Sequence, residues 1–107
     1  VEMRSPGVEE PSTVATNDEA IFVGGSNGVV RIDWPDGSPE WIDDRPVNGL
    51  HFFGDRLLAG GPEWGVFEVG AETRLGIDEI RLAGRLAGSS TLFVADWGGA
   101  AVWAIYP

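Results

Sequence analysis

The chain has 107 residues, and its 17 acidic and 7 basic side chains give a formal net charge of −10. That length corresponds to one domain, and so negative a charge argues against binding to the phosphate backbone of nucleic acids. The chain has no cysteine and a single histidine, which excludes disulfides, thiolate metal sites and zinc sites with two imidazoles. The longest apolar run, 100–106, is far below the roughly 20 residues of a membrane span. We therefore expect a cytoplasmic protein with no membrane contact, no metal ion and no cofactor.

All seven basic side chains are arginine, and lysine is absent. Abundant acids without lysine resemble the surfaces of proteins from salt-loving archaea. In about 1 M salt the Debye length falls to about 3 Å, so repulsion between neighbouring acids nearly vanishes. The alternative origin is a genome rich in G and C, which favours arginine codons over lysine codons.

The first third of the chain predicts four short strands separated by turns. An apolar run ends at Gly24-Gly25, and Ser26-Asn27-Gly28 then predicts a tight hairpin, because Asn and Gly accept the positive φ of a primed turn. Beyond the hairpin, Val30 and Ile32 alternate with polar residues, as in a strand with one buried face. The predicted strands are 14–17, 20–23, 29–32 and 41–43.

The rest of the chain repeats this order twice, and helix is nearly absent from the prediction. No segment of ten or more residues keeps a 3.6-residue period without an interrupting glycine or proline. The second unit predicts strands at 50–53, 57–59, 65–69 and 73–77. The third unit predicts strands at 82–87, 91–95 and 101–106.

One apolar segment recurs in all three units. Its copies begin at positions 36 and 35 residues apart, and a valine within each copy recurs at intervals of 37 and 36. A period in this range indicates one supersecondary unit stacked on copies of itself. The copies begin at Ile21, Leu57 and Leu92, and the recurring valines are Val29, Val66 and Val102.

Four antiparallel strands per unit at this period resemble the blades of a β-propeller. The resemblance implies an all-β fold of about three four-stranded blades in a single domain, 1–107, and it extends to uncharacterised propeller proteins of halophilic archaea. The Trp-Asp and Gly-His marks of the best known propeller repeat are absent. The blades are expected at about 12–43, 48–77 and 82–107, with residues 1–4 as a closing strand displaced to the N-terminus.

Three blades are fewer than the four to eight of a complete ring. An isolated partial ring would expose the faces of its two end blades, and large apolar patches are unusual on soluble monomers. We therefore expect either a piece of a longer chain or a homodimer that closes a six-bladed ring.

The resemblance also implies where a ligand would bind. In a propeller the hairpin tips between second and third strands lie on the same face as the connections between blades. Tryptophans beside carboxylates on such a face suit a sugar ring or a cationic peptide, held by stacking or cation–π contacts. The candidate ligand-binding residues are Asp44, Arg45, His51, Glu63, Trp64, Asp96 and Trp97.

Each of these assignments has an alternative. Trp64 and Trp97 would serve equally well as packing between neighbouring tips. His51 lies in an inner strand, where a histidine is usually hydrogen-bonded within the core, although it would also line a central channel with Arg45 and Asp55.

Other aromatic and acidic residues are assigned to structure. Trp34, Trp41 and Trp103 lie on or beside predicted strands and are expected in the core between blades. The doublets Asp43-Asp44 and Asp78-Glu79 have the composition of a paired-carboxylate or Ca²⁺ site. In so acidic a chain, a solvated surface is the expectation for both doublets.

Three functions are compatible with these observations. The first is a noncatalytic module that binds a protein or a small-molecule ligand on the face of hairpin tips, or that scaffolds an assembly. The second is a fragment of a propeller enzyme, a hydrolase or lyase acting on glycans. The stretch from Asp36 to Trp41 resembles the Asp box of sialidase-type propellers, but it departs from that motif in two ways. Its Gly-to-Trp spacing is one residue too long, and the Thr of the motif is missing. The third is a structural ring segment whose partner is itself. No acid, nucleophile or metal-ligand cluster recurs at a position expected to face the channel, which favours the first and third functions.

Overall fold

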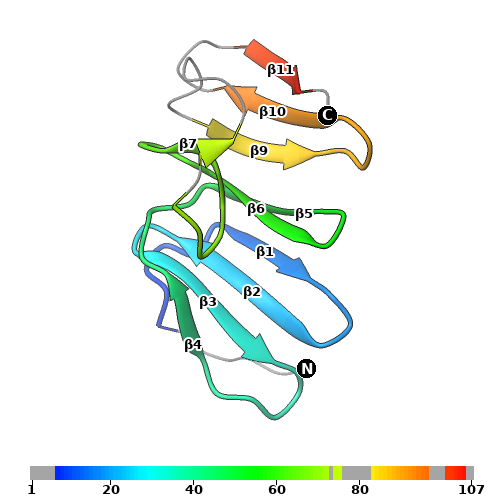
Figure 1. The fold of residues 1–107 in the computed structure, drawn as a ribbon. Coiled ribbons are helices and arrows are strands. Elements are labelled where there is room, and N and C mark those ends of the chain that lie inside the picture. The colour runs from blue at the N-terminus through cyan, green and yellow to red at the C-terminus, as the bar shows by residue number, and fades with distance from the viewer. Residues whose placement is uncertain (1–6, 73, 76–82, 97–100, 106–107) are drawn as a thin grey trace.

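In the computed structural model, the described chain consists of β-strands and the loops between them (Figure 1). The structure describes residues 7–72, 74–75, 83–96 and 101–105. Its strands form three antiparallel sheets, ordered β1-β2-β3-β4, β5-β6-β7-β8 and β11-β10-β9, which we call the first, second and third sheets. The all-β prediction is confirmed. The strands are β1 (Thr13–Thr16), β2 (Ala20–Gly25), β3 (Gly28–Asp33), β4 (Glu40–Asp43), β5 (Gly49–Phe53), β6 (Arg56–Gly61), β7 (Gly65–Glu68), β8 (Arg74–Leu75), β9 (Ala83–Ala87), β10 (Leu92–Asp96) and β11 (Ala101–Ile105).

The three sheets lie one above another, with the second sheet between the first and the third (Figure 1). Strand β5 contacts both β1 and β9, so the first strand of each sheet lies next to the first strand of its neighbour. Within the described residues the three sheets follow one another without closing into a ring. None of the described segments forms a helix with the length and apolarity that a membrane crossing requires.

The β2–β3 hairpin is tight, as predicted, but its backbone differs from the prediction. Ser26 and Asn27 form the turn, and Gly25 pairs with Gly28. Positive φ occurs at Gly28, at 131°, whereas the non-glycine residue with positive φ in the described chain is Glu10. The expected positive φ at Asn27 was therefore wrong.

The first and second sheets enclose one apolar core. Strand alternation directs Phe22 and Val29 of the first sheet toward Leu50 and Phe67 of the second, and all four are buried. Phe22 also packs edge to face on Phe52, with ring centroids 5.4 Å apart. Burying each such side chain contributes about 1.5–3 kcal/mol, so this core is a main source of stability.

The second and third sheets enclose a second core, in which backbones approach closely. A Cβ added at Gly49 or Gly60 would lie 2.6 or 2.5 Å from the carbonyl oxygen of Gly84, so both positions require glycine. Asn48 Nδ2 donates a hydrogen bond of 3.1 Å to the Ala83 carbonyl oxygen, which ties the connection before β5 to the third sheet. The buried members of this core are Leu58, Val66, Ala83, Leu86, Leu92 and Val94.

Two tryptophans lie outside the core, against prediction. Trp34 and Trp41 are 50% and 49% exposed. Trp41 lies on β4, the outer strand of the first sheet, and Trp34 follows β3 at the turn into β4, so neither is covered by a second sheet. Trp103 is half-buried against the second core, as expected, and its indole Nε1 donates to Asp96 Oδ2 over 2.8 Å.

The strands predicted at 1–4 and 73–77 lie wholly and partly, respectively, outside the described residues. The strand predicted at 73–77 is observed as β8, Arg74–Leu75, with residues 73, 76 and 77 outside the described residues. The closing strand predicted at 1–4 also lies outside the described residues.

Candidate functional site

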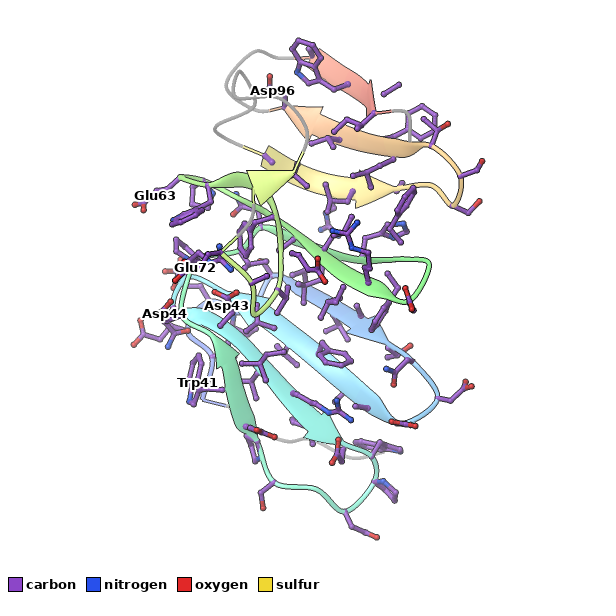
Figure 2. The ribbon with its side chains drawn as sticks, in the orientation of Figure 1. Trp41, Asp43, Asp44, Glu63, Glu72 and Asp96 are labelled. Atoms are coloured by element: carbon purple, nitrogen blue, oxygen red, sulfur yellow. The ribbon has the colours of Figure 1, made fainter. Side chains whose placement is uncertain are left out.

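One edge of the molecule gathers the β2–β3 and β6–β7 hairpin tips, the connection from β4 to β5 and the turn after β7. We call it the tip edge. Figure 2 shows the labelled side chains along this edge, from Trp41 beside the first sheet, through Asp43, Asp44, Glu72 and Glu63, to Asp96 on the third sheet. The tip edge therefore brings acidic residues of all three sheets to one side of the molecule.

Two shallow, open hollows adjoin one another on the tip edge. The first has a volume of about 520 Å³ and the second about 540 Å³. They adjoin one another at Ile42, Asp43 and Asp44, which line both, and we refer to the two hollows together as the depression. The first is completed by Arg45, Trp64, Gly70, Ala71 and Glu72, and the second by Asn27 and Trp41.

A buried ion pair forms the floor of the first hollow. Arg45 Nε donates to Asp43 Oδ1 over 2.9 Å, and Arg45 Nη2 donates to Asp43 Oδ2 over 2.6 Å. The pair is bidentate, the geometry in which guanidinium and carboxylate bind most strongly. The carboxylate side chain is 3% exposed and the arginine side chain 13% exposed. Asp43 is thus buried, contrary to the solvated surface expected for its doublet, whereas Asp44 is exposed as expected.

Aromatic rings complete the surroundings of Arg45. Its Cζ lies 3.9 Å from the ring centroid of Phe67 and 4.7 Å from that of Trp64. Arg45 Nη2 also donates to the carbonyl oxygen of Ala71. The guanidinium therefore links the connection before β5 to the turn after β7, and its charge is already balanced by Asp43.

The environment of the Asp43 carboxyl changes its acidity. Burial raises the pKa of Asp43, but hydrogen bonds outweigh that effect and hold the pKa below its usual value. The donors are the guanidinium of Arg45 and the backbone N–H groups of Gly70 and Arg45, at 2.8 and 3.0 Å for the two backbone bonds. Asp43 is therefore held as the carboxylate.

Five of the residues expected to bind a ligand lie on the tip edge. Arg45 and Trp64 are in contact with one another, and Asp44 lines both hollows. Glu63 is exposed at the β6–β7 tip. Asp96 belongs to the same edge, but it is buried and accepts the hydrogen bond from Trp103.

The other two expected residues lie elsewhere. Trp97 falls outside the described residues. His51 is in the middle of β5, where its Nε2 lies 2.6 Å from the carbonyl oxygen of Gly88, at the contact between the second and third sheets. This position matches the hydrogen-bonded alternative considered for His51.

Most residues that line the depression were absent from the predicted set, among them Trp41, Asn27 and Glu72. Trp41 was assigned to the core because strand aromatics are usually buried, and only its place on an outer strand distinguishes it. The sequence around Asn27 predicts a hairpin, but it does not predict which residues lie beside Asn27 on the tip edge. Glu72 lies in a glycine-flanked turn with no sequence feature of a site.

Within the described part of the chain, no three Asp, Glu, His or Cys side chains gather as they would around a metal ion. No protein-family model, no curated protein and no solved structure matches the chain. The arrangement of the depression is therefore the basis for any statement about function.

Proposed function

We propose that the chain is a noncatalytic binding module of β-propeller type, whose tip edge takes an arginine- or lysine-bearing segment of a partner protein. One observation carries this proposal: the depression combines the exposed carboxylate of Asp44 and the half-exposed indole of Trp41 with a cation, Arg45, that is already neutralised. The charge available to a ligand is therefore negative.

The propeller assignment is supported by the repeated arrangement of the sheets. The first two sheets have the same strand order, the third repeats its first three strands, and successive sheets pack through their first strands. The sequence period of 35 to 37 residues matches the spacing of the sheets along the chain. The β2–β3 and β6–β7 tips and the connection from the first sheet to the second share one edge, as expected for propeller blades.

Electrostatics favours a cationic partner. The chain carries a formal net charge of −10, so a basic segment is attracted over distance and aligned by the acidic tip edge. A guanidinium or ammonium group over the face of Trp41 contributes about 0.5–1 kcal/mol at an exposed site. Arg45 between Phe67 and Trp64 shows that this edge already accommodates a guanidinium against aromatic rings.

Glycan hydrolysis is less well supported by the same residues. That reaction needs two carboxyl groups on either side of the glycosidic bond, one with a raised pKa so that it donates a proton. Asp43 is bonded to Arg45 and its pKa is lowered instead. The most enclosed carboxylate of the depression is therefore unsuited to be the acid.

The proposal is tested by calorimetric titration with a blocked peptide of alternating arginine and glycine. We expect binding in about 0.1 M salt and weaker binding in about 1 M salt, because the Debye length falls from about 10 to about 3 Å. Trp41→Ala is expected to raise the dissociation constant about 2- to 5-fold, the equivalent of one exposed cation–π contact. Asp44→Asn is expected to weaken binding as well.

Asp55→Asn is the matched control, because it removes the same charge from the β5–β6 turn at the opposite end of the second sheet. If Asp55→Asn weakens binding as much as Asp44→Asn, the attraction is general and the tip edge is not the site. Equal binding of a peptide with glutamate in place of arginine, or preferential binding of neutral oligosaccharides, would contradict the proposal.

A further inference from the structure

Corresponding residues of β2, β6 and β10 have different exposures. Phe22 and Leu58 are 36 residues apart, and each is buried against the sheet that follows its own. Phe93, 35 residues further on, is 45% exposed. The position that faces the next sheet in the first two units thus faces no sheet in the third.

The recurring valines repeat this difference. Val29, Val66 and Val102 are each the second residue of their strands β3, β7 and β11. Val29 and Val66 are fully buried in the two cores, whereas Val102 is 73% exposed. At two independent positions, the third sheet therefore exposes a residue whose counterparts in the first and second sheets are buried.

Cross-strand pairing shows that these residues share a face. Phe93 pairs with Ala87 and with Ala104, and Ala95 pairs with Val102, so their side chains point to the same side of the third sheet. This set, Ala87, Phe93, Ala95, Val102 and Ala104, is here called the trailing face. These five residues are apolar, and the exposed Arg85, two residues before Ala87 on β9, borders them.

The first sheet exposes a residue at a position that is buried in the second and third sheets. Leu50 and Leu86, 36 residues apart, are buried against the sheet that precedes their own. Val14, 36 residues before Leu50, is 62% exposed on β1. The face of the first sheet that carries Val14 is here called the leading face. Its residues Val23, Val30 and Ile32 are buried together with Val8, so Val14 is its exposed apolar residue.

We infer that the trailing face of one copy packs against the leading face of a second copy, with Phe93 and Val102 beside Val14 of the other chain. The contact continues the two interfaces within the chain, in which Phe22 packs with Leu50 and Leu58 packs with Leu86. A second copy is the fitting occupant because its exposed Val14 stands at the position of Leu50 and Leu86, which meet the preceding sheet inside the chain.

Symmetry makes a closed pair the expected product. A contact between two different faces is heterologous, and such contacts either close into a ring or extend indefinitely. Two copies bring six sheets together, which lies within the four to eight blades of known propeller rings. Because each copy carries a charge of −10, the pair is expected to be tighter in high salt.

Light scattering after gel filtration in high salt gives the direct test. We expect a mass twice the 11.4 kDa of one chain. Val102→Glu and Val14→Glu each place a charge in both contacts of the closed pair, so each variant is expected at the mass of one chain. Ser38→Glu, in the exposed β3–β4 turn, is the control and should leave the pair intact.

Mixing the two variants distinguishes a contact between unlike faces from one between like faces. The Val14→Glu copy keeps its trailing face and the Val102→Glu copy keeps its leading face, so the equimolar mixture should recover the mass of two chains through one contact. Circular dichroism identical to that of the unchanged chain shows that each variant is folded.

Several results would overturn the inference. The unchanged chain at the mass of one copy in high salt, up to millimolar concentration, excludes the pair outright. A pair that is lost with Val102→Glu but retained with Val14→Glu indicates two trailing faces in contact. A mixture that stays at the mass of one chain, although both variants are folded, also contradicts the inference.

Discussion

The β2–β3 and β6–β7 tips each hold the chain segment that leads into their own sheet, and they use different interactions. At the first tip, Asn27 Oδ1 accepts a hydrogen bond from the backbone N–H of Glu9 over 2.8 Å. Arg45 stands 36 residues after Glu9, and at the second tip it stacks on Trp64 while bonded to Asp43. One tip relies on a neutral amide, and the other on a buried ion pair between aromatic rings.

The difference has energetic consequences. A hydrogen bond between neutral groups contributes about 0.5–1.5 kcal/mol net, and its loss at a surface is tolerated. Removing one partner of a buried ion pair costs about 3–5 kcal/mol, because the other charge remains buried and unpaired. Loss of the side-chain interaction is therefore expected to cost more at the second tip than at the first, although both tips contribute residues to the candidate site.

The largest effect is expected at the first tip, from Gly28→Val. A Cβ at Gly28 would lie 2.2 Å from the carbonyl oxygen of Asp43, and the φ of 131° is one that β-branched residues rarely adopt. Overpacking costs about 1–3 kcal/mol and positive φ a further 1–2, so we expect a loss of about 3 kcal/mol or more in the free energy of unfolding. Urea denaturation measures it.

Gly54→Ala is the control for Gly28→Val. Gly54 also has positive φ, at 66°, but a Cβ there meets no atom within 4 Å. We expect a loss of about 1–2 kcal/mol from the backbone conformation alone. Equal losses for the two variants would show that the contact between the first tip and Asp43 has no energetic role.

The next effect is expected at the second tip, from Arg45→Met. Methionine keeps contact with Phe67 but leaves the Asp43 carboxylate without its bidentate partner. We expect a loss of about 3 kcal/mol in the free energy of unfolding, again by urea denaturation. Arg56→Met is the matched control, since its ion pair with Glu68 is half-exposed and is worth less than about 1 kcal/mol.

The double variant Asp43→Asn, Arg45→Met removes both charges of the buried pair. Since replacing a whole buried pair is often close to neutral, it should be more stable than Arg45→Met alone. If the double variant is instead less stable than either single variant, the buried charges are not the cause of the loss.

The strands and turns could be predicted because their signals are local. Apolar alternation located β3, and the glycines of 24–28 located the first hairpin, since both depend on residues a few positions apart. The turn pattern wrongly assigned positive φ to Asn27, and it could not predict that the Asn27 side chain accepts a hydrogen bond from Glu9, 18 residues away.

The candidate site could be predicted only in part. Arg45 and Trp64 were expected on the same edge, because the resemblance to propeller blades implied that hairpin tips and connections lie together. Asp43 and Arg45 are two positions apart, but Asp43 also accepts a hydrogen bond from Gly70, 27 residues away, and no local pattern specifies that contact. Trp41 was misassigned because its hydrophobicity says nothing about whether another sheet covers β4.

The smallest effect is a difference in acid sensitivity between the tips. Because the folded pKa of Asp43 lies below its ordinary value of 3.8, ionised Asp43 stabilises the fold above that pH, and this contribution is lost as pH falls through the lowered pKa. Asp43→Asn should therefore lose less stability than the unchanged chain between pH 5 and strong acid, in parallel urea titrations. Asn27→Ala, which alters the uncharged tip, should follow the unchanged chain over the same range. Parallel curves for all three proteins would show that the acid sensitivity arises from the other carboxylates, and that the buried pair at the second tip makes no separate contribution to it.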